Sequence, residues 1–415
     1  MKSEDQALLS FGVCAASVLA IRRAHPFRLT RTRVFVGTML FTAWQRFLAS
    51  GMTTKTISSH FYVPAEWPEK EQHVGGLPLH RGFEHMVDKT CVVTGVSPGG
   101  IGFYTAAQLF RLGARVIVTT RETDPYKMHD LAVEVVKAAD VHEAYVGATT
   151  RIDRVQVVTL DLGGDIPDAV RSCVAQLDEL GVDCVDVLVN NAGAMYQLGD
   201  GHSPRFHAGM GLEKHFAVNT VAPILLTEAL KPRIPVGGRV VHVASDAHRQ
   251  VAALDTAKQL LQGRAVSRSF LQYYGASKLG NIVYAATQNR RDKHHVHVAV
   301  HPGVAVTNIY RDQSSLQFFK QYGLLAWIEG LTLLALKSPK EASHTSVHCA
   351  VDPFVPRAVA ERGEFYFVDC APGNKYLSKI ARTEAAQDEC MSTINELIDA
   401  ALERKKKDDL RKRPT

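Results

Sequence analysis

The nine residues TGVSPGGIG, at positions 94–102, follow the apolar run Cys91–Val93 and precede a pattern typical of an amphipathic helix. A glycine-rich loop between a strand and a helix is typical of a dinucleotide-binding site. We expect Gly95 to permit the tight turn and Gly100 to let backbone N–H groups approach a pyrophosphate. Gly102 would let the helix pack close to the sheet. The position between strand and helix, rather than the glycines alone, favours this interpretation.

Strand-like and helical patterns alternate from Lys89 onward. This alternation predicts a single α/β Rossmann domain with a doubly wound parallel sheet. The chain has 415 residues, 46% of them hydrophobic, which is enough to bury such a core. No repeat of fixed period indicates a solenoid or a propeller. We place the Rossmann domain at 88–383 and expect a helical lid over the substrate site at 311–338.

The strand predicted at Arg115–Thr120 ends immediately before Arg121. In a fold of this type, the residue at this edge of the sheet meets the adenosine ribose. A carboxylate suits a free 2′-hydroxyl, whereas an arginine suits a 2′-phosphate. Thr120 stands where an acidic residue would favour NAD(H), although Glu122 follows closely. The arginine therefore favours NADP(H) over NAD(H) as the cofactor.

Two further strands end in residues that a dinucleotide would meet. One apolar run, 157–162, ends in Asp161 and Leu162, and another leads into Asn190-Asn191-Ala192-Gly193. Open α/β sheets bind ligands at the carboxyl ends of their strands. We expect the Asp161 carboxylate to accept a hydrogen bond from the adenine amino group. The alanine and glycine that end the second loop would leave room for the ribose.

A tyrosine and a lysine stand one helical turn apart in Tyr274-Gly275-Ala276-Ser277-Lys278, and Ser245 ends an upstream apolar strand. Reduction of a carbonyl group needs a hydride and a proton for the developing alkoxide. A tyrosine hydroxyl ordinarily has a pKa of about 10, which a nearby cation lowers, and Lys278 on the same helix face can supply that charge. Ser245 would donate a hydrogen bond to the substrate oxygen as its charge grows.

Residues 88–310 resemble the short-chain dehydrogenase/reductase family, because a glycine loop, an NNAG sequence, a serine and a YxxxK motif occur in that family's order. The resemblance implies a catalytic set of Asn219, Ser245, Tyr274 and Lys278. In the family, the asparagine holds a water molecule that connects the lysine to solvent. The motif His301-Pro302-Gly303 resembles the family's PGxxxT element. It implies that Val304 and Thr307 hold the carboxamide and phosphate side of the cofactor.

Together these patterns predict a cofactor site that is distributed over several strand ends. Its expected residues are Gly95, Ser97, Gly100, Ile101, Gly102, Arg121, Asp161, Leu162, Asn190, Asn191, Ala192, Gly193, Tyr274, Lys278, Val304 and Thr307. The chain departs from the family in a glycine loop that is one residue longer, with Pro98-Gly99 inside it. We expect phosphate binding to survive this insertion.

The motif Gly211–Phe216 and the motif Phe365–Cys370 resemble the retinol-dehydrogenase-like branch of the family. The apolar stretch 316–336, which follows Val306–Tyr310, is similar to membrane-bound enzymes that act on polyprenol and dolichol-type substrates. The resemblance implies a retinoid, isoprenoid or steroid-like substrate, with reduction as the expected direction. A double-bond reductase and a catalytically silent nucleotide-binding regulator are the alternatives. Ser245 and the complete catalytic set argue against them.

Charge, cysteine and histidine patterns exclude other functions. Residues 1–60 carry +6 and residues 401–415 carry +4, so the net charge of +6 leaves −4 for the middle of the chain and no basic surface for nucleic acid there. Seven cysteines without CxxC spacing favour a reducing compartment. We expect His294, His295 and His297 to be solvated loop residues and predict no metal site.

Residues 1–52 contain apolar runs at Ala7–Ile21 and Val34–Leu48 with arginines between them. Each run is shorter than the roughly 20 residues that span a bilayer comfortably. We favour a membrane anchor with the catalytic domain in the cytosol, at the endoplasmic reticulum rather than the mitochondrion. A mitochondrial presequence and a helix packed on the domain are the alternatives. Residues 53–87 would form a linker.

The C-terminal region 384–415 is predicted to contain a helix at Ala385–Leu402 and a solvated basic tail. Members of the family often form dimers through a four-helix interface. A homodimer that uses Asn281–Gln288 is therefore a possible assembly of the chain.

Overall fold

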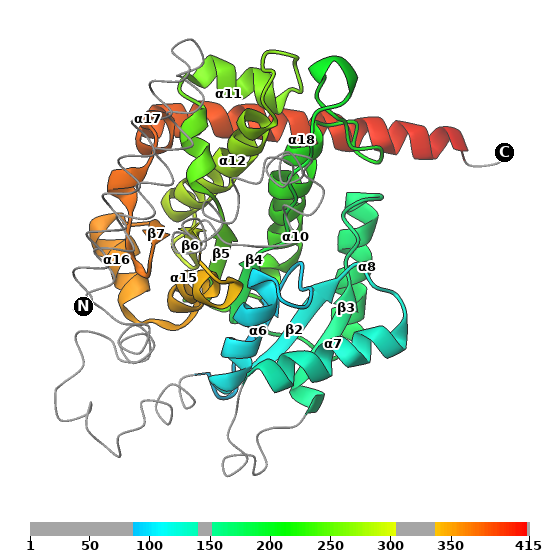
Figure 1. The fold of residues 1–415 in the computed structure, drawn as a ribbon, viewed down its shortest axis with the longest axis vertical. Coiled ribbons are helices and arrows are strands. Elements are labelled where there is room, and N and C mark those ends of the chain that lie inside the picture. The colour runs from blue at the N-terminus through cyan, green and yellow to red at the C-terminus, as the bar shows by residue number, and fades with distance from the viewer. Residues whose placement is uncertain (1–85, 140–151, 304–336, 413–415) are drawn as a thin grey trace, which may run out of the picture.

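The computed structural model describes residues 86–139, 152–303 and 337–412 (Figure 1). The predictions for the segment 1–52, for the linker up to residue 85 and for the lid up to residue 336 lie outside these ranges, as do the cofactor contacts of Val304 and Thr307. Among the helices in these ranges, none combines the length and the hydropathy needed to cross a bilayer.

The described strands form one sheet of eight, in the order β3-β2-β1-β4-β5-β6-β7-β8. The strands are β1 Thr90–Val93, β2 Arg115–Thr120, β3 Val155–Thr159, β4 Val187–Asn190, β5 Arg239–Val243, β6 Val296–His301, β7 Tyr366–Val368 and β8 Ala371–Pro372. All neighbouring pairs are parallel except β7 with β8. The order reverses between β1 and β4, where sheets of this kind bind dinucleotides. The predicted doubly wound parallel sheet is confirmed.

Helices cover both faces of the sheet. The described helices are α6 Ile101–Arg111, α7 Pro125–Ala138, α8 Ile166–Glu179, α9 Lys214–Phe216, α10 Ala222–Leu230, α11 Leu254–Leu261, α12 Phe270–Arg291, α15 Pro339–Val351, α16 Phe354–Arg362, α17 Lys379–Arg382 and α18 Glu384–Lys412. A π-helical turn, η4 (Ala217–Val221), joins α9 to α10, and a 3-10 helix, η6 (Asp246–Gln250), follows β5. Short 3-10 turns lie at η2 Ile152–Arg154, η3 Asp200–His202, η5 Lys231–Arg233 and η8 Asn374–Tyr376.

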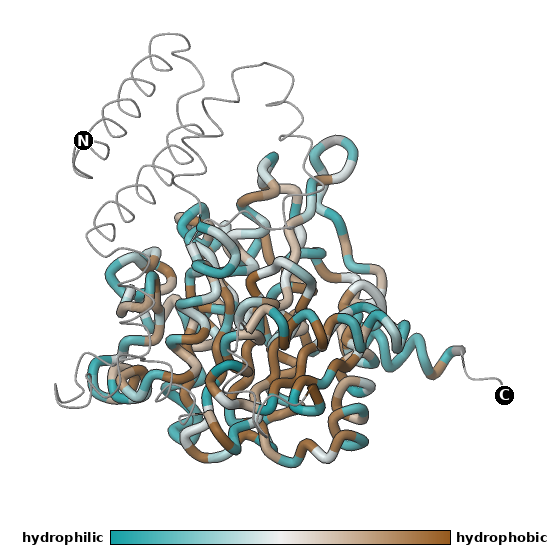
Figure 2. Tube along the Cα trace, turned by 60° about the horizontal axis from the view of Figure 1, so that its bottom comes forward, coloured by the Kyte–Doolittle hydropathy of each residue, from teal (hydrophilic) through white to brown (hydrophobic). Residues whose placement is uncertain are grey.

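Alternate strand residues enter two separate hydrophobic cores. Val92 and Leu188 pack with α8, α10 and α12, whereas Cys91 and Val189 pack with α6, α7 and α15. This alternation follows from the two-residue period of a strand. Because both faces are covered, the strands are nearly continuous runs of valine and isoleucine. Figure 2 shows hydrophobic residues gathered inside the body and a hydrophilic C-terminal end of the chain.

The C-terminal helix α18 is longer than predicted. It continues from Glu384 to Lys412, so the expected end of the helix at Leu402 is wrong, while residues 403–411 are exposed apart from the half-buried Lys405. Near its end, Lys405 Nζ lies 2.7 Å from Asp165 Oδ2, at the start of α8, and this ion pair ties the basic turns to the body. Its earlier turns lie across α12 and α11 (Figure 1). Residues 281–287 of α12 are buried within the chain, so they offer no exposed surface to a second copy.

Candidate active site

The glycine-rich loop closes into a turn that accommodates its additional residue. Gly100 N donates to Ser97 O over 2.9 Å, and Gly99 has a φ of +71°. With Pro98 at the second position, these are the features of a type II turn, which needs a positive φ at its third residue. Gly100 is then the N-cap of α6 and has no side-chain cap. The first N–H groups of the helix therefore remain suited to a phosphate.

The loops after β1 and β4 touch each other at their glycine and alanine residues. A Cβ at Gly95, where φ is +67°, would lie 2.6 Å from Ala192 Cα, and a Cβ at Gly102 would collide with the Asn191 amide. The Thr94 hydroxyl accepts from Asn191 N and Ala192 N at 3.0 and 2.9 Å. Asn191 Nδ2 donates to Thr94 O over 2.8 Å. The asparagine therefore fixes the two loops to each other.

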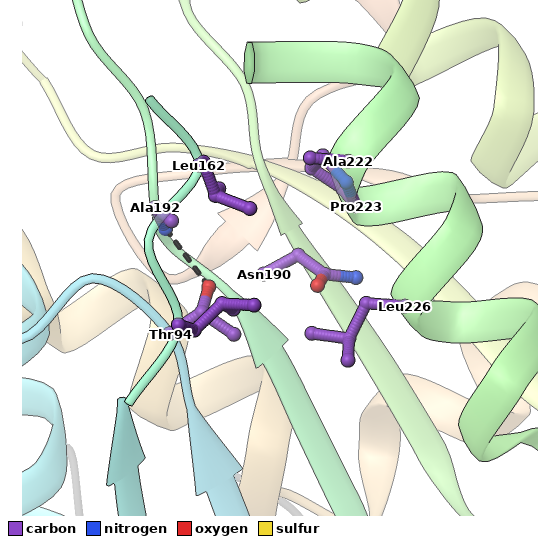
Figure 3. Close-up of a pocket in the computed structure, with 8 residues that line it drawn as sticks. Thr94, Leu162, Asn190, Ala192, Ala222, Pro223 and Leu226 are labelled. Atoms are coloured by element: carbon purple, nitrogen blue, oxygen red, sulfur yellow. Dashed lines mark hydrogen bonds between the residues drawn. The ribbon is translucent and has the colours of Figure 1, made fainter. Parts of the chain in front are cut away.

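A small cavity of about 10 Å³ lies behind these loops. It is lined by Thr94, Leu160, Leu162, Asn190, Ala192, Ala222, Pro223 and Leu226 (Figure 3). A volume of this size holds about one water molecule, not a substrate or a cofactor. Figure 3 shows the hydrogen bond between Thr94 and Ala192 on one side and the helix that carries Leu226 on the other. The cavity belongs to the packing behind the nucleotide loops.

Arg121 and Glu122 follow β2 and have different surroundings. Arg121 is exposed at the carboxyl end of the strand. The Glu122 carboxylate accepts from Thr123 N and Asp124 N at 3.0 and 3.1 Å, and it lies 3.3 Å from Lys127 Nζ. The two backbone hydrogen bonds lower the pKa of Glu122. The acidic side chain is thus engaged within its own loop, and the arginine is the exposed charge next to the strand end.

Asp161 and Leu162 lie beyond the end of β3, because this strand stops at Thr159 rather than at residue 162 as predicted. Asp161 is exposed, and its Oδ1 accepts from Gly163 N over 3.0 Å. The Leu162 side chain is buried in the core, and its carbonyl oxygen lies 2.7 Å from His207 Nε2. The side chain and the carbonyl oxygen of the leucine are therefore engaged within the chain, and its cofactor contact stays a prediction.

Asn219 lies in the π-helical turn η4, a local irregularity that is frequent at functional sites. Its Oδ1 accepts from Ala194 N over 2.8 Å, and its Nδ2 donates to Ala194 O over 2.9 Å. The same Nδ2 donates to Ser277 Oγ over 3.1 Å. One side chain thereby joins the loop after β4 to the helix that carries the tyrosine and the lysine.

Lys278 is brought beside Tyr274 on α12. Its Nζ lies 5.7 Å from the centroid of the Tyr274 ring and donates to Val243 O over 2.7 Å. A Cβ at Gly193 would lie 3.2 Å from this Nζ, so the glycine allows the backbone after β4 to approach the lysine. Only 3% of Lys278 is exposed, and burial lowers its pKa to about 8.

Ser245 follows β5 and is the N-cap of η6. Its Oγ accepts from Ala247 N over 3.2 Å, which leaves the hydroxyl proton for donation to another oxygen. A Cβ at Gly275 would collide with Ala247 O, so η6 packs directly against the residue after Tyr274. The serine therefore stands next to the start of α12.

Glu213 and His215 are buried at the same site and were not predicted as site residues. His215 Nδ1 lies 2.8 Å from Glu213 Oε1, and the centroids of the His215 and Tyr274 rings lie 6.2 Å apart. The motif Gly211–Phe216 contained both residues, but a motif does not reveal which way a short helical turn points its side chains. We call Glu213, His215, Asn219, Tyr274 and Lys278 the catalytic cluster.

A second group of buried polar side chains, the histidine cluster, consists of Asn190, His242, Tyr284 and His297. The His242 and His297 rings stack with centroids 5.9 Å apart, and Tyr284 packs edge-on against both. Within the described part of the chain, Asn190 Oδ1, His242 Nε2 and His297 Nδ1 have no hydrogen-bond partner. Burial lowers the pKa of His297 to about 3 and that of His242 well below its usual value.

The prediction that the histidines near residue 295 are solvated loop residues is wrong for two of them. His297 is on β6 and only 2% exposed, and His295 is held by Asp292 and by the carbonyl of Ile234 at 2.8 and 3.0 Å. Polar atoms of Asp292, His295 and His297 lie within 4.8 Å of one another. The Lys231 ammonium already lies 2.9 Å from Asp292 Oδ2, so the carboxylate has a cation next to it.

A parallel sheet with a glycine loop at its switch point, and a tyrosine–lysine pair on a following helix, defines the class of dinucleotide-dependent oxidoreductases. A model of the family described as short chain dehydrogenase matches residues 89–257. Retinol dehydrogenase 14 of mouse is 31% identical, over 72% of this chain and 82% of that protein. The dehydrogenase/reductase SDR family member FEY of Arabidopsis thaliana is 29% identical, over 85% of this chain and 95% of that protein.

The crystal structure of an uncharacterized protein from Mycobacterium paratuberculosis shares the fold, with a TM-score of 0.50 and 23% identity over 75% of this chain and 94% of that chain. The protein therefore belongs to the short-chain dehydrogenase/reductase family and is similar to its retinol dehydrogenases. It is an oxidoreductase of the kind that interconverts carbonyl and alcohol groups.

Proposed function

We propose that the protein is an NADP(H)-dependent reductase of an apolar carbonyl compound and that Tyr274 is its general acid/base. The observation that carries the proposal is the placement of the Lys278 ammonium 5.7 Å from the Tyr274 ring centroid, in the same buried site as Asn219. A positive charge there stabilises the phenolate that forms when the tyrosine hydroxyl gives up its proton.

The residues fit a bound dinucleotide. Gly95 lets the glycine loop lie against Ala192 of the loop after β4, and α6 begins without a side-chain cap, so its first N–H groups suit a pyrophosphate. When bound, the cofactor supplies the hydride. The Tyr274 hydroxyl then donates its proton to the substrate oxygen, and the Ser245 hydroxyl donates a hydrogen bond to the same oxygen. Lys278 holds the resulting negative charge on the tyrosine.

The preference for NADP(H) is supported by the two charges after β2. Arg121 is exposed beside the strand end, whereas the Glu122 carboxylate is turned into its own loop and toward Lys127. We expect Arg121→Ala to raise the dissociation constant for NADPH by about 10–100-fold, the loss of a charge-assisted contact, and to leave that for NADH unchanged. Fluorescence titration with both nucleotides measures this. An equal loss for both nucleotides would contradict the assignment.

We also propose a retinoid, isoprenoid or steroid-like substrate and attachment to a membrane through residues 1–52. The similarity to retinol dehydrogenases supports the first, and the apolar runs Ala7–Ile21 and Val34–Leu48 support the second. A substrate that dissolves in lipid is most accessible to an enzyme held at a lipid surface. A homodimer would use a surface other than 281–287, since those residues are buried in the chain.

The test is NADPH oxidation by the full-length protein in detergent with all-trans-retinal, farnesal and a steroid ketone. We expect turnover of at least one of them, and we expect Tyr274→Phe to lower kcat by about 10²–10⁴-fold in a protein that still binds NADPH. NADPH binding without any turnover would favour a silent regulator. Unaltered turnover in Ser245→Ala would favour a double-bond reductase over a carbonyl reductase.

A further inference from the structure

We propose that Glu213 and His215 are positioning residues for Tyr274. In this proposal they hold the backbone at Tyr196 and support the tyrosine ring, so that the segment 193–196 and Tyr274 keep one relative geometry during the reaction. The inference rests on the proposed function, because it concerns the surroundings of the same general acid/base.

The hydrogen bonds of His215 define its protonation state. Its Nε2 accepts from Tyr196 N over 2.8 Å, because a backbone N–H can only donate. The single ring proton is then on Nδ1, which donates to Glu213 Oε1 over 2.8 Å. The other carboxylate oxygen of Glu213 accepts from Phe216 N over 2.8 Å. The imidazole is therefore neutral, and both of its nitrogens are engaged.

His215 on α9 and Asn219 on the following turn η4 act on the same stretch of backbone. They are four residues apart, which places their side chains next to each other. Asn219 binds both the N–H and the carbonyl of Ala194, and His215 binds the N–H of Tyr196. The stretch begins at Gly193, where a Cβ would be 3.2 Å from the Lys278 ammonium. The backbone thus runs past the lysine, the asparagine and the histidine in turn.

The His215 ring also supports two aromatic rings. It packs edge-on against Tyr196 and Tyr274, with centroid distances of 5.4 and 6.2 Å. The Tyr196 ring has a further contact, because Lys214 Nζ lies 4.4 Å from its centroid. Because Glu213 and His215 are only 1% and 2% exposed, water does not replace the bonds that either residue loses on substitution.

Neither ring nitrogen of His215 is directed at a reacting group, since Tyr196 N and Glu213 occupy them. The histidine therefore does not exchange a proton with the substrate in this arrangement. Its contribution is to the geometry of Tyr274 and of the backbone beside it, and a displacement of about 1 Å in such a site is sufficient to lower a rate by about 10²-fold.

Two amide variants separate the two hydrogen bonds of His215. In His215→Asn the amide nitrogen takes the place of Nδ1 and keeps the bond to Glu213, but no acceptor reaches Tyr196 N. In His215→Gln the amide oxygen takes the place of Nε2 and keeps the acceptor for Tyr196 N. We expect His215→Asn to lower kcat by about tenfold or more at unchanged KM and NADPH affinity, whereas His215→Gln keeps kcat within about threefold.

Hydrogen exchange of the Tyr196 amide in the full-length protein gives a readout that needs no substrate. The amide should be protected in the wild type and in His215→Gln, and it should exchange faster in His215→Asn. Equal kcat and equal exchange in the two variants would overturn the proposal. If neither variant folds, an unprotected Tyr196 amide in the wild type would overturn it equally.

Tyr274→Phe, assayed beside them with all-trans-retinal and NADPH, distinguishes failure of the proposed function from failure of the positioning role. Turnover that survives Tyr274→Phe contradicts the proposed function. Turnover that is lost in Tyr274→Phe but retained in His215→Asn contradicts only the positioning role.

Discussion

The catalytic cluster and the histidine cluster both pack against α12 in the same core, yet they differ in how many of their polar atoms have a hydrogen-bond partner. In the catalytic cluster, Asn219, His215 and Lys278 each have a hydrogen-bond partner at 2.7–2.9 Å. In the histidine cluster, three polar atoms lack a partner among the described residues, although all four side chains are buried. Two groups with similar burial therefore differ in bonding.

The comparison distinguishes two effects: hydrogen bonds orient a buried side chain, and burial keeps a histidine uncharged. Hydrogen bonds at fixed distances hold a side chain in one direction, which a proton transfer requires. In the histidine cluster, His242 Nδ1 lies 3.4 Å from Asn190 Nδ2, but His242 Nε2 and His297 Nδ1 have no partner among the described residues, and burial keeps both rings uncharged. We infer that hydrogen bonds fix the geometry of the catalytic cluster, whereas the two histidines of the histidine cluster lower the stability of the fold in acid.

Lys278→Met is the strongest test of this separation. We expect kcat to fall by about 10²–10⁴-fold, because the phenolate of Tyr274 loses its cation. The free energy of unfolding at pH 7 should rise, because the variant no longer buries an ammonium whose pKa is held at about 8. Steady-state kinetics and urea unfolding measure the two effects. Lys379→Met, at an exposed position, should change neither; parallel losses of activity and stability in Lys278→Met would contradict the separation.

In the wild type, raising the pH should likewise change activity and stability in opposite directions. Above about pH 8 the ammonium of Lys278 loses its proton, so kcat/KM for reduction should fall about tenfold per pH unit. The pKa of the folded state lies below the ordinary value of 10.5, so the contribution of this group to stability rises over the same window, from about pH 8 to 10.5. A kcat/KM that stays level to pH 10 would be inconsistent with this lysine as the essential cation.

Acid should act on the histidine cluster instead. The pKa of His297 is about 3 in the folded state and near 6.5 when unfolded, so the stability that this residue contributes is complete above pH 6.5 and is lost as the pH falls toward 3. At pH 5 the loss is about 2 kcal/mol for one such histidine. We expect His297→Phe to reduce the dependence of urea unfolding on pH between 6.5 and 5. His294→Phe, at an exposed neighbour, should leave it unchanged.

Thr227→Val gives the smallest expected effect and tests whether the clusters are independent. The Thr227 hydroxyl accepts from Asn190 Nδ2 over 2.9 Å in a site that is 1% exposed. Its loss should cost about 1–2 kcal/mol of unfolding free energy. The kcat should not change. A large loss of kcat at full folding would show that the two clusters are coupled through Asn190.

The fold could be predicted from the sequence because the strands are buried on both faces and the glycine loop stands between a strand and a helix. Runs such as Arg115–Thr120 have the bounds that were expected. The path of Ser97–Gly100 could not be predicted, since it depends on a turn closed by one hydrogen bond. The end of β3 was placed three residues too late because Leu160 and Leu162 continue the apolar pattern after the strand has ended.

The catalytic cluster was only partly predictable. Spacing on one helix brings Tyr274 and Lys278 together, so the motif is sufficient there. Glu213 and His215 depend on the direction of a three-residue helix and on a loop that precedes it by about twenty residues. The histidine cluster draws one residue from each of three neighbouring strands. A single histidine inside a valine run, as at His242 or His297, was the available signal, and only the strand order joins them.

The position of α18 has a consequence for how the protein is made. Ile394 of this helix lies within 3.4 Å of a Cβ placed at Gly280, in the middle of α12, yet more than 90 residues separate the end of one helix from the start of the other. A ribosome adds about 5–20 residues per second, so the side of α12 that α18 covers stays uncovered for roughly 5–20 s before α18 is synthesised. During that interval the nascent chain exposes an apolar surface that the finished enzyme never shows, and this is the stage at which chaperones would bind it.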